Sequence, residues 1–453
     1  MQPLPKEFEE QMKRLLGEAG FFAYLDALNQ PYARALRVNL LLRPDGTPPC
    51  PIKGLGAPVP WAKGAYFVEG DARPGLSPLH EGGLFYMQEP SALTAVTALD
   101  PQPGERVLDL CAAPGGKSTQ IAALMAGRGL LCCNEPIPSR AQILSRNIER
   151  MGVRNAVVLS AMPDALAPRF PAFFDRILVD APCSGEGMFR RQPEARDEWD
   201  ADAPRRCADR QMEILAQAAK MLRPGGTMVY STCTFNDTEN EGVLMRFLAL
   251  HPEFSLVPFA LPGLPEAKDG YLHLYPHEMR GEGHFVSRLK KADGADEADA
   301  PVQAAPQRKA PARAAAKGKA PAPIALPDVF SDVFAPERLY TAGDALWMLP
   351  EGISIERLSG LRVLRTGLLL AHAEGKRSEP DHALAMALRP EEAARTASLT
   401  QTQALAYQAG ETLSLGDLPG GYTLLCCEGV SLGWGKQAGG LMKNHYPKGL
   451  RRR

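Results

Sequence analysis

The segment VLDLCAAPGGKST, residues 107–119, passes from an apolar run through two glycines into the expected first turn of a helix. A buried strand that enters such a turn lets backbone N–H groups and a helix N-terminus approach a nucleotide closely. The tail GGKS is similar to a phosphate-binding P-loop, but that loop requires glycine where Cys111 stands. The segment therefore predicts a nucleotide-binding turn at the edge of a parallel sheet rather than a P-loop.

Strands and helices are expected to alternate around this turn, over residues 103–289. The expected strands cover residues 106–110, 130–134, 156–159, 176–180 and 227–231. The expected helices cover residues 118–125, 139–151, 205–222 and 239–250. Such alternation is typical of an α/β fold whose helices cover both faces of a parallel sheet. After Pro252, the runs YLHLYP and HFVSRLKK leave no room for a crossover helix between them, so we expect an antiparallel pair at one sheet edge.

The rest of the chain is expected to form further domains, because 453 residues are more than one ordinary domain contains. A hydrophobic content of 45% is enough for each domain to have its own core. An Ala-, Pro- and Lys-rich stretch that is nearly devoid of large apolar side chains predicts a flexible linker. The chain begins with an amphipathic helix, whose apolar stripe includes Phe8 and Met12, followed by the strand-like run RALRVNLLL. We expect an α+β accessory domain at residues 1–95, the sheet domain at 96–290, the linker at 291–325, and C-terminal domains at 326–395 and 396–453.

Composition and charge narrow the classes of protein to which the chain can belong. A net charge of -1 means that any affinity for nucleic acid must come from local basic patches. Without a signal peptide or an apolar run long enough to cross a bilayer, the sequence predicts a cytoplasmic protein with no membrane partner. Nine cysteines, none in a C-x-x-C spacing, favour reduced thiols and no metal site. We expect a monomer.

Two acidic residues follow strands at the expected ligand-binding edge. Glu135 comes directly after the second strand, where parallel folds place a carboxylate that accepts hydrogen bonds from ribose hydroxyls. The alternative is an exposed loop glutamate. Asp164 follows the third strand and is a candidate for an adenine contact, although an aspartate after a proline also serves as a turn former or helix cap.

Two cysteines stand directly after neighbouring expected strands, Cys183 in ILVDAPCSGEGMF and Cys233 in VYSTCTF. Adjacent strands lie about 5 Å apart, so both thiols are expected to face the crevice that also holds the glycine-rich turn. Free cysteines are usually buried and inert, and we interpret the following as packing residues: Cys111, Cys132, Cys207, Cys426 and Cys427. For Cys183 and Cys233 their position beside turn residues favours chemistry instead.

Together, DLCAAPGGKST, DAPCSGEGMF and YSTCTF resemble the Sun/Fmu/RsmF family of RNA cytosine-5 methyltransferases. The resemblance covers the whole chain. FYMQEPSAL at residues 85–93 is similar to the family's lead-in to its catalytic domain, and GWGKQAGGLMKNHYPKGLR at residues 433–451 is similar to the tail of RsmF-type members that act on 16S ribosomal RNA.

The resemblance implies a fold, a cofactor and roles for individual residues. The fold would be a Rossmann-like sheet of seven strands with the last antiparallel, followed by PUA-like RNA-binding modules. S-adenosylmethionine would be held by Cys111, Ala112, Ala113, Pro114, Gly115, Gly116, Lys117, Glu135 and Asp180. The region of Asp164 departs from the family pattern, which puts its adenine contact in doubt. Cys233 would attack carbon 6 of the cytosine, Cys183 would assist product release, and Asp180 with Lys117 would hold the base.

The residues alone leave the choice of nucleophile open. DNA cytosine-5 methyltransferases use the cysteine of the Pro-Cys dipeptide, which here is Cys183, whereas the RNA family resemblance favours Cys233. Addition of a thiolate at carbon 6 makes carbon 5 nucleophilic, so either thiol suits covalent catalysis on a pyrimidine.

Basic and aromatic residues near the C-terminus combine charge for phosphates with rings for stacking on bases. The candidates for RNA contact are Trp434, Lys443, Tyr446, Lys448 and Arg451, with Arg190 and Arg191 after the Cys183 loop. A solvated basic tail is the alternative. The expected substrate is 16S ribosomal RNA or the small-subunit particle. Transfer RNA is the second candidate, and a non-catalytic RNA-binding assembly factor is a third.

Overall fold

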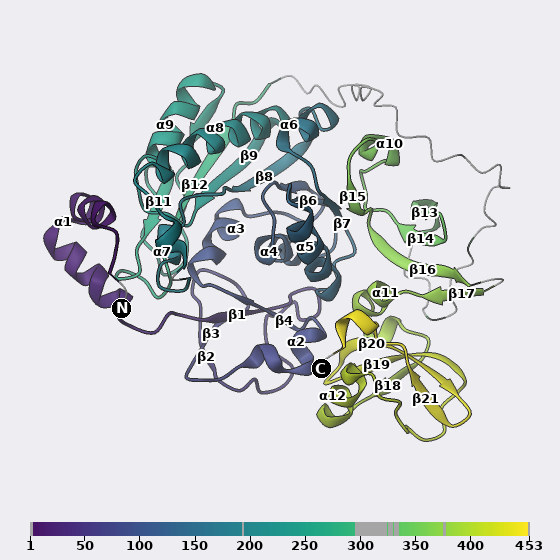
Figure 1. Cartoon of the computed structure of the whole chain (residues 1–453). Helices are drawn as coiled ribbons and strands as arrows, with labels where there is room; N and C mark the ends of the chain where they lie inside the picture. Colours follow the sequence, from purple (N-terminus) through teal and green to yellow (C-terminus); the bar gives the residue numbers. More distant parts are fainter. Residues whose placement is uncertain are drawn as a thin grey trace.

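The computed structural model describes residues 3–192, 194–294, 324, 329, 335–374 and 377–451. Strands in this part of the chain form four sheets, and Figure 1 shows the three smaller ones beside the large central sheet. The expected linker, residues 291–325, lies outside the described residues apart from 291–294 and 324.

Nine strands form the central sheet: β5 (Arg106–Asp109), β6 (Leu130–Asn134), β7 (Ala156–Leu159), β8 (Phe174–Asp180), β9 (Leu222–Thr232), β10 (Phe254–Leu256), β11 (Tyr271–Leu274), β12 (His284–Lys291) and β15 (Val363–Arg365). Their order is β10-β12-β9-β8-β5-β6-β7-β15, and β11 also pairs with β12. Strands β5 to β9 are parallel, and β12 is antiparallel to β9. The expected α/β fold is confirmed.

Two details of the sheet differ from the expectation of seven strands. The expected antiparallel pair of β11 and β12 lies at one edge of the sheet, as predicted, but β10 also pairs with β12 there. In addition, β15 from the C-terminal part pairs antiparallel with β7. An open edge strand presents unpaired backbone groups, which β15 satisfies here. Strand β15 has only three residues and comes more than two hundred positions after β7. Such a short segment shows no periodicity, so the sequence did not predict this strand.

Helices cover both faces of the central sheet, as expected. One face carries α3 (Thr94–Leu99), α4 (Gly116–Leu124) and α5 (Pro138–Arg150), and the other carries α6 (Pro163–Leu166), α8 (Ala203–Met221) and α9 (Glu241–Leu250). Successive residues of β5 point to opposite faces, so that Val107 joins the core under α4 and Leu108 joins the core under α8. This places the carboxyl ends of the strands, with their loops, at one open edge.

The N-terminal part consists of α1 (Lys6–Leu28), α2 (Pro78–Glu81) and a sheet in the order β2-β3-β1-β4, made of β1 (Ala35–Val38), β2 (Leu55–Pro58), β3 (Ala65–Val68) and β4 (Phe85–Gln88). Phe8 and Met12 are fully buried, as the helix stripe predicted. The ring of Phe8 packs 4.9 Å from that of Phe189, just after the Cys183 loop. Helix α1 therefore supports the loops at the open edge of the central sheet.

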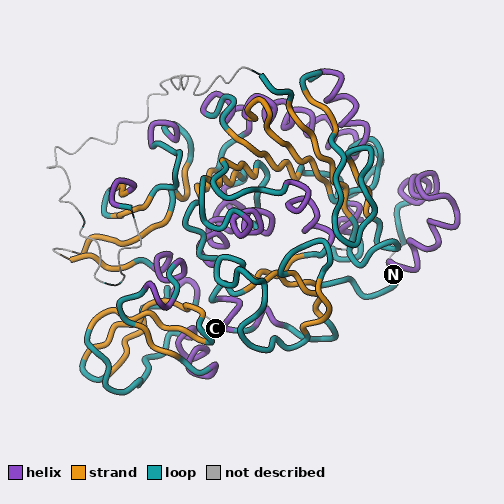
Figure 2. The backbone as a smooth tube through the Cα atoms, turned by 180° about the vertical axis from the view of Figure 1, so that it is seen from behind, coloured by secondary structure: helices purple, strands orange, loops and turns teal. Residues whose placement is uncertain are grey.

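The C-terminal part forms two further sheets. The first has β13 (Leu339–Ala342), β14 (Ala345–Met348), β16 (Leu368–Glu374) and β17 (Arg377–Pro380), with helices α10 (Ile355–Leu358) and α11 (His382–Ala387). The second has β18 (Thr396–Ser398), β19 (Gly421–Cys427), β20 (Val430–Ala438) and β21 (Leu441–Asn444), with α12 (Gln401–Ala409). Figure 2 shows both sheets beside the central one from behind. Arg154, which precedes β7 of the central sheet, donates to Ala387 O and Glu392 of this C-terminal part.

Short connecting elements complete the described chain. Helix α7 covers Glu194–Glu198, and 3-10 helices lie at Pro74–Leu76, Ser91–Leu93, Ala167–Arg169, Glu186–Met188, Pro336–Arg338, Pro390–Glu392 and Lys448–Leu450. Every helix among the described residues is too short or too polar to span a bilayer. The same residues contain no group of three or more His, Cys, Asp or Glu side chains arranged for a metal ion.

Candidate active site

The glycine-rich turn joins β5 to α4 at the open edge of the central sheet. Gly115 has φ of 114°, and a Cβ there would lie 3.2 Å from the Leu144 side chain, so only glycine fits without strain. At the start of the turn, Asp109 is fully buried and accepts a hydrogen bond from Ser118 Oγ at 2.6 Å. Its second oxygen, Oδ1, has no hydrogen-bond partner among the described residues. Burial raises the pKa of Asp109 to about 7, although the Ser118 bond opposes this.

Glu135 and Asp164, two acidic residues that the sequence predicted to contact the cofactor, are placed differently. Glu135 is buried at the end of β6, where its Oε1 accepts a hydrogen bond from the backbone N–H of Ile137 at 2.9 Å. Its Oε2 lies 3.4 Å from the Arg140 guanidinium. Asp164 is instead exposed in the first turn of the short helix α6. Glu135 thus lies where the sequence predicted, while no contact of Asp164 supports a ligand role.

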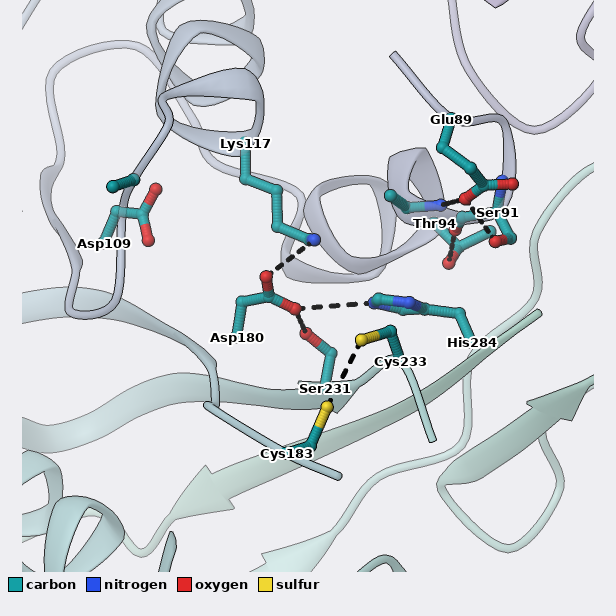
Figure 3. A network of polar contacts seen from close by, with 12 residues as sticks. Glu89, Ser91, Thr94, Asp109, Lys117, Asp180, Cys183, Ser231, Cys233 and His284 are labelled. Atoms are coloured by element: carbon teal, nitrogen blue, oxygen red, sulfur yellow. Dashed lines mark hydrogen bonds and ion pairs between the residues drawn. The ribbon is translucent and has the colours of Figure 1, made fainter. Parts of the chain in front are cut away.

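Asp180, the last residue of β8, is the centre of a polar network that Figure 3 shows from close by. Lys117 Nζ donates to Asp180 Oδ2 at 2.8 Å, and Ser231 Oγ donates to Asp180 Oδ1 at 2.8 Å. His284 Nε2, from β12, lies 3.5 Å from the same Oδ1. Burial alone would raise the pKa of Asp180, but the Lys117 ammonium and His284 outweigh it and hold that pKa below its usual range. Asp180 is therefore an ionised carboxylate.

Lys117 carries the matching positive charge. Burial tends to lower the pKa of Lys117, but the attraction of Asp180 outweighs it and raises that pKa above its usual value, with a smaller contribution from Cys233. The pKa of His284 is lowered by burial and then by Lys117, so this imidazole is neutral at pH 7. The network thus holds one fixed cation beside the thiol of Cys233.

The two cysteine thiols meet at this network. Their Sγ atoms are 3.3 Å apart and face each other in Figure 3. Both cysteines are partly accessible. The distance agrees with the prediction that the two thiols come together, and the crevice that they would share stays a prediction. The pKa of the Cys183 thiol is raised well above its usual value by its hydrogen bond with Cys233, by burial, and by nearby negative charge that includes Glu239. Cys183 is therefore a protonated thiol, whereas Cys233 interacts electrostatically with the ammonium of Lys117.

A pair of buried glutamates joins the two cysteine loops, and we call these residues the glutamate clamp. Glu186, in the Cys183 loop, accepts hydrogen bonds from the backbone N–H groups of Phe235 at 2.8 Å and Asn236 at 3.0 Å. Glu239, which follows the Cys233 loop, accepts one from the backbone N–H of Ser184 at 3.1 Å. Each loop thus supplies the carboxylate that binds the backbone of the other.

Side chains from two helices complete the clamp. Asn236 Nδ2 bridges it by donating to Glu186 Oε1 at 3.1 Å and to Glu239 Oε1 at 2.8 Å. Gln211, from α8, donates to Glu239 at 2.8 Å, and Gln11, from α1, donates to Glu186 at 3.0 Å. Charge-assisted bonds of this kind are stronger than neutral ones and become more so when buried. The clamp therefore fixes the distance between the two thiols.

Several residues of this site were not predicted from the sequence. His284 approaches Asp180 from a strand more than a hundred residues away, and no local pattern indicated it. Glu186 and Glu239 are both fully buried, although each lies in a polar segment. Asp109 could have been found, because it is the acidic residue that directly precedes the glycine-rich turn.

The two arginines expected to contact RNA beside the Cys183 loop have different environments. Arg190 is almost fully buried and forms a two-bond ion pair with Glu282 at 2.8 and 2.9 Å. This burial contradicts the expectation that Arg190 meets a phosphate. Arg191 is exposed, and its guanidinium lies 5.7 Å from the centre of the Tyr32 ring. Arg191 stays a candidate.

The predicted aromatic contacts in the C-terminal part are wrong for the same reason. Trp434, in β20, is 2% exposed, and its indole N–H donates to Asp381 O at 2.8 Å. Tyr446 is 4% exposed and packs edge-on against the Tyr407 and His382 rings. Neither ring is available to stack on a base. The remaining candidates are the exposed Lys443 and Lys448, and Arg451, which is partly buried against Tyr446 O.

Family models match four consecutive parts of the chain. The model described as 16S rRNA methyltransferase RsmB/F matches residues 96–290, which hold the whole central site except its N-terminal support. The N-terminal domain of 16S rRNA methyltransferase RsmF matches residues 4–90. The RsmF first C-terminal domain matches residues 327–388, and the methyltransferase RsmF PUA domain matches residues 394–452.

Relatives match over nearly the full length. The ribosomal RNA small subunit methyltransferase F of Enterobacter sp. (strain 638) is 35% identical, over 98% of this chain and 95% of its own. Its namesake from Erwinia tasmaniensis is 34% identical, over 98% and 96%. Among solved structures, a methyltransferase homolog protein from Pyrococcus horikoshii is 30% identical, with a TM-score of 0.54, and covers 63% of this chain and 95% of its own. With its cysteine pair, its Asp180 network and these full-length matches, the chain belongs to the RsmF family of 16S rRNA methyltransferases.

Proposed function

We propose that the protein transfers a methyl group from S-adenosylmethionine to carbon 5 of a cytosine in 16S ribosomal RNA, through a covalent bond between Cys233 and carbon 6. The observation that carries this proposal is the meeting of two thiols, 3.3 Å apart, beside the ion pair of Lys117 and Asp180. Carbon 5 of cytosine is a poor nucleophile, and thiolate addition to carbon 6 splits one difficult step into two easier ones.

The electrostatics of the crevice favour Cys233 as the attacking thiol. A thiolate forms most readily near a positive charge and least readily near a negative one. Lys117 interacts with Cys233, whereas the pKa of Cys183 is raised by its bond to Cys233, by burial and by charges that include Glu239. The Sγ of Cys183 is therefore suited to donate a hydrogen bond to its neighbour before attack.

The remaining groups hold the cytosine and move its protons. Asp180 and Lys117 bind the polar edge of the base, and the Cys233 thiolate adds to carbon 6 so that carbon 5 becomes electron-rich. S-adenosylmethionine supplies, when bound, the electrophilic methyl group that carbon 5 takes. The carbon 5 proton then passes to solvent water, with Cys183 assisting. The electron pair of the broken C–H bond restores the double bond between carbons 5 and 6, and the bond between Cys233 and carbon 6 breaks to return the thiolate.

The open edge near the glycine-rich turn suits this cofactor. The buried Asp109 Oδ1 has no hydrogen-bond partner among the described residues, and a buried acceptor of this kind calls for a donor from a ligand. The turn from Cys111 to Lys117 brings backbone groups to the same edge, and Glu135 closes it at the end of β6. We propose these residues as the cofactor site, with Asp164 as the weakest member.

The proposal extends to the parts that recruit RNA. We propose that residues 1–95 and the C-terminal segments 326–395 and 396–453 bind RNA around the catalytic part at 96–290, and that Arg191, Lys443, Lys448 and Arg451 contact phosphates. The PUA match at residues 394–452 supports an RNA-binding role for the last segment. We expect the protein to act as a monomer.

Incubation with methyl-labelled S-adenosylmethionine tests the substrate. Small-subunit particles, naked 16S ribosomal RNA and transfer RNA are compared in parallel, and label is expected in one of the first two, at carbon 5 of cytosine. Label in transfer RNA alone would move the activity to that substrate. The absence of label in all three would favour a non-catalytic assembly factor.

Two cysteine variants test the chemistry. Cys183→Ala is expected to accumulate a covalent protein–RNA adduct on a denaturing gel, because product release loses its helper. Cys233→Ala is expected to form no adduct and to lose methyl transfer by about four orders of magnitude or more. The opposite pattern would assign Cys183 as the nucleophile. Cys207→Ala, a change of the same type outside the crevice, is the control.

A further inference from the structure

A large cavity opens between the N-terminal part and the catalytic part. Its volume is about 1050 Å³, and it is lined within residues 27–34, 68–73 and 276–281, together with Arg190. We call it the Arg73 groove. These segments follow α1, follow β3 and connect β11 to β12, and Figure 1 shows these elements in the left half of the molecule. The volume is at the upper limit of small-ligand sites, which span about 300–1,000 Å³.

The charges that line the Arg73 groove do not cancel. Arg280 is paired with Glu69 by two bonds of 2.8 and 2.9 Å, and Arg190 is paired with Glu282. Arg34 donates to backbone carbonyls, Ala72 O at 2.8 Å and Gly70 O, so its positive charge has no anionic partner there.

Two exposed charged side chains from the loop after β3 also line the groove. Arg73 and Asp71 are both exposed, and neither forms an ion pair or a side-chain hydrogen bond within the described part of the chain. Arg34 and Arg73 thus leave two positive charges against the single negative charge of Asp71. Such a surface attracts a polyanion.

An aromatic ring lies at the same groove. Tyr32 lines the cavity with 44% of its surface exposed, and the Arg191 guanidinium lies 5.7 Å from the centre of its ring. An exposed ring flanked by cations is the combination with which proteins hold unpaired nucleotides, the ring stacking on a base and the cations meeting phosphates.

The groove is close to the catalytic network along the chain. Gly281, in its wall, accepts a hydrogen bond from Arg190 at 3.0 Å, and His284 beside Asp180 follows three residues later. Three residues span at most about 11 Å. The intervening Glu282 is tied to the catalytic part by its backbone N–H, which donates to Glu89 at 2.8 Å. A strand in the groove therefore reaches the crevice within a few nucleotides.

We propose that the Arg73 groove binds the unpaired RNA strand next to the target cytosine, with phosphates at Arg34 and Arg73 and a base on Tyr32. This inference rests on the proposed function and adds the path of the substrate. A cytosine must leave its helix before its carbons 5 and 6 can be reached, and the groove stabilises the strand that this opening exposes.

Two substitutions of opposite sign at neighbouring exposed positions test the groove. Arg73→Gln is expected to weaken binding of a 16S ribosomal RNA fragment about fivefold at low salt, and to reduce the slope of log K against log salt by about 0.7. Asp71→Asn is expected to tighten binding about twofold to fivefold, because it removes a repulsive charge. Arg246→Gln is the control, since it makes the same charge change on α9, whose residues are not among those that line the groove. Affinities are measured by filter binding.

The proposal would be overturned if Arg73→Gln and Arg246→Gln changed the RNA affinity equally, or if Asp71→Asn left it unchanged. Loss of methylation of assembled particles in Arg73→Gln, with RNA affinity unchanged, would assign the groove to a ribosomal protein and would overturn it too. Failure of the proposed function has a different signature, because the unmodified protein would then transfer no methyl group to any RNA.

Discussion

The sequence pointed to two regions as functional, the cysteine pair Cys183 and Cys233 and the C-terminal strands around Trp434. In the structure the two cysteines are partly accessible, whereas the Trp434 ring is buried. The cysteines lie just beyond the ends of β8 and β9, at the open edge of a parallel sheet. Trp434 lies in the middle of β20, where it faces a core that includes Leu424. The position of a residue relative to the end of its strand thus separates function from packing better than its type.

The comparison between the cysteine pair and the Trp434 region can be tested by mutation. The largest effect among these tests, on the rate of methyl transfer, is expected at the glutamate clamp. In Glu239→Gln, the new amide NH₂ faces one of three donors that now point at the carboxylate, from Ser184, Asn236 and Gln211. The resulting shift of the thiols is expected to slow single-turnover methyl transfer about 100-fold.

Glu213→Gln, on the exposed face of α8, is the matched control. Circular dichroism and cofactor binding establish that the clamp variant is folded. A clamp variant that is folded but keeps its full rate would show that the bonds between the loops have no role in positioning the thiols.

A smaller effect, on stability instead of chemistry, is expected at Trp434. Trp434→Ala removes a fully packed ring and is expected to lower the free energy of unfolding of the C-terminal part by about 3–5 kcal/mol. Trp434→Phe keeps most of the packing but loses the bond to Asp381 O, at a cost of about 1 kcal/mol. Urea unfolding measures both. If Trp434→Ala kept its stability and lost RNA affinity, the ring would act on RNA after all.

The smallest effect is a pH dependence in the same C-terminal core. Burial lowers the pKa of His382 to about 4, and nearby Asp381 opposes this only in part. An unfolded histidine, with a pKa near 6.5, binds a proton first, so the folded state loses stability as pH falls from about 6.5 to 4.

Between pH 7 and pH 5 the expected loss is about 1–2 kcal/mol. His382→Gln, compared by urea unfolding at the two values, is expected to remove this difference. An unchanged difference would assign it to other groups.

The sequence predicted what neighbouring residues determine and missed what distant residues supply. The glycine-rich turn, Asp180 and both cysteines could be read because each directly follows an apolar strand of a parallel sheet. His284 and β15 could not, since both meet the site or the sheet through pairings between segments far apart in the chain. Arg190 was misjudged because its partner, Glu282, lies 92 residues away.

The pairing of β15 with β7 holds the C-terminal part at a set distance from the central part. The strand continues the catalytic sheet into the C-terminal part, and ion pairs from Arg365 to Glu149 and from Arg154 to Glu392 brace the joint. The central part and the C-terminal part therefore keep a constant separation. With RNA bound at the C-terminal part as proposed, we expect the protein to methylate only certain folded RNAs. In these, the distance between the bound element and the target cytosine matches the distance between the two parts of the protein.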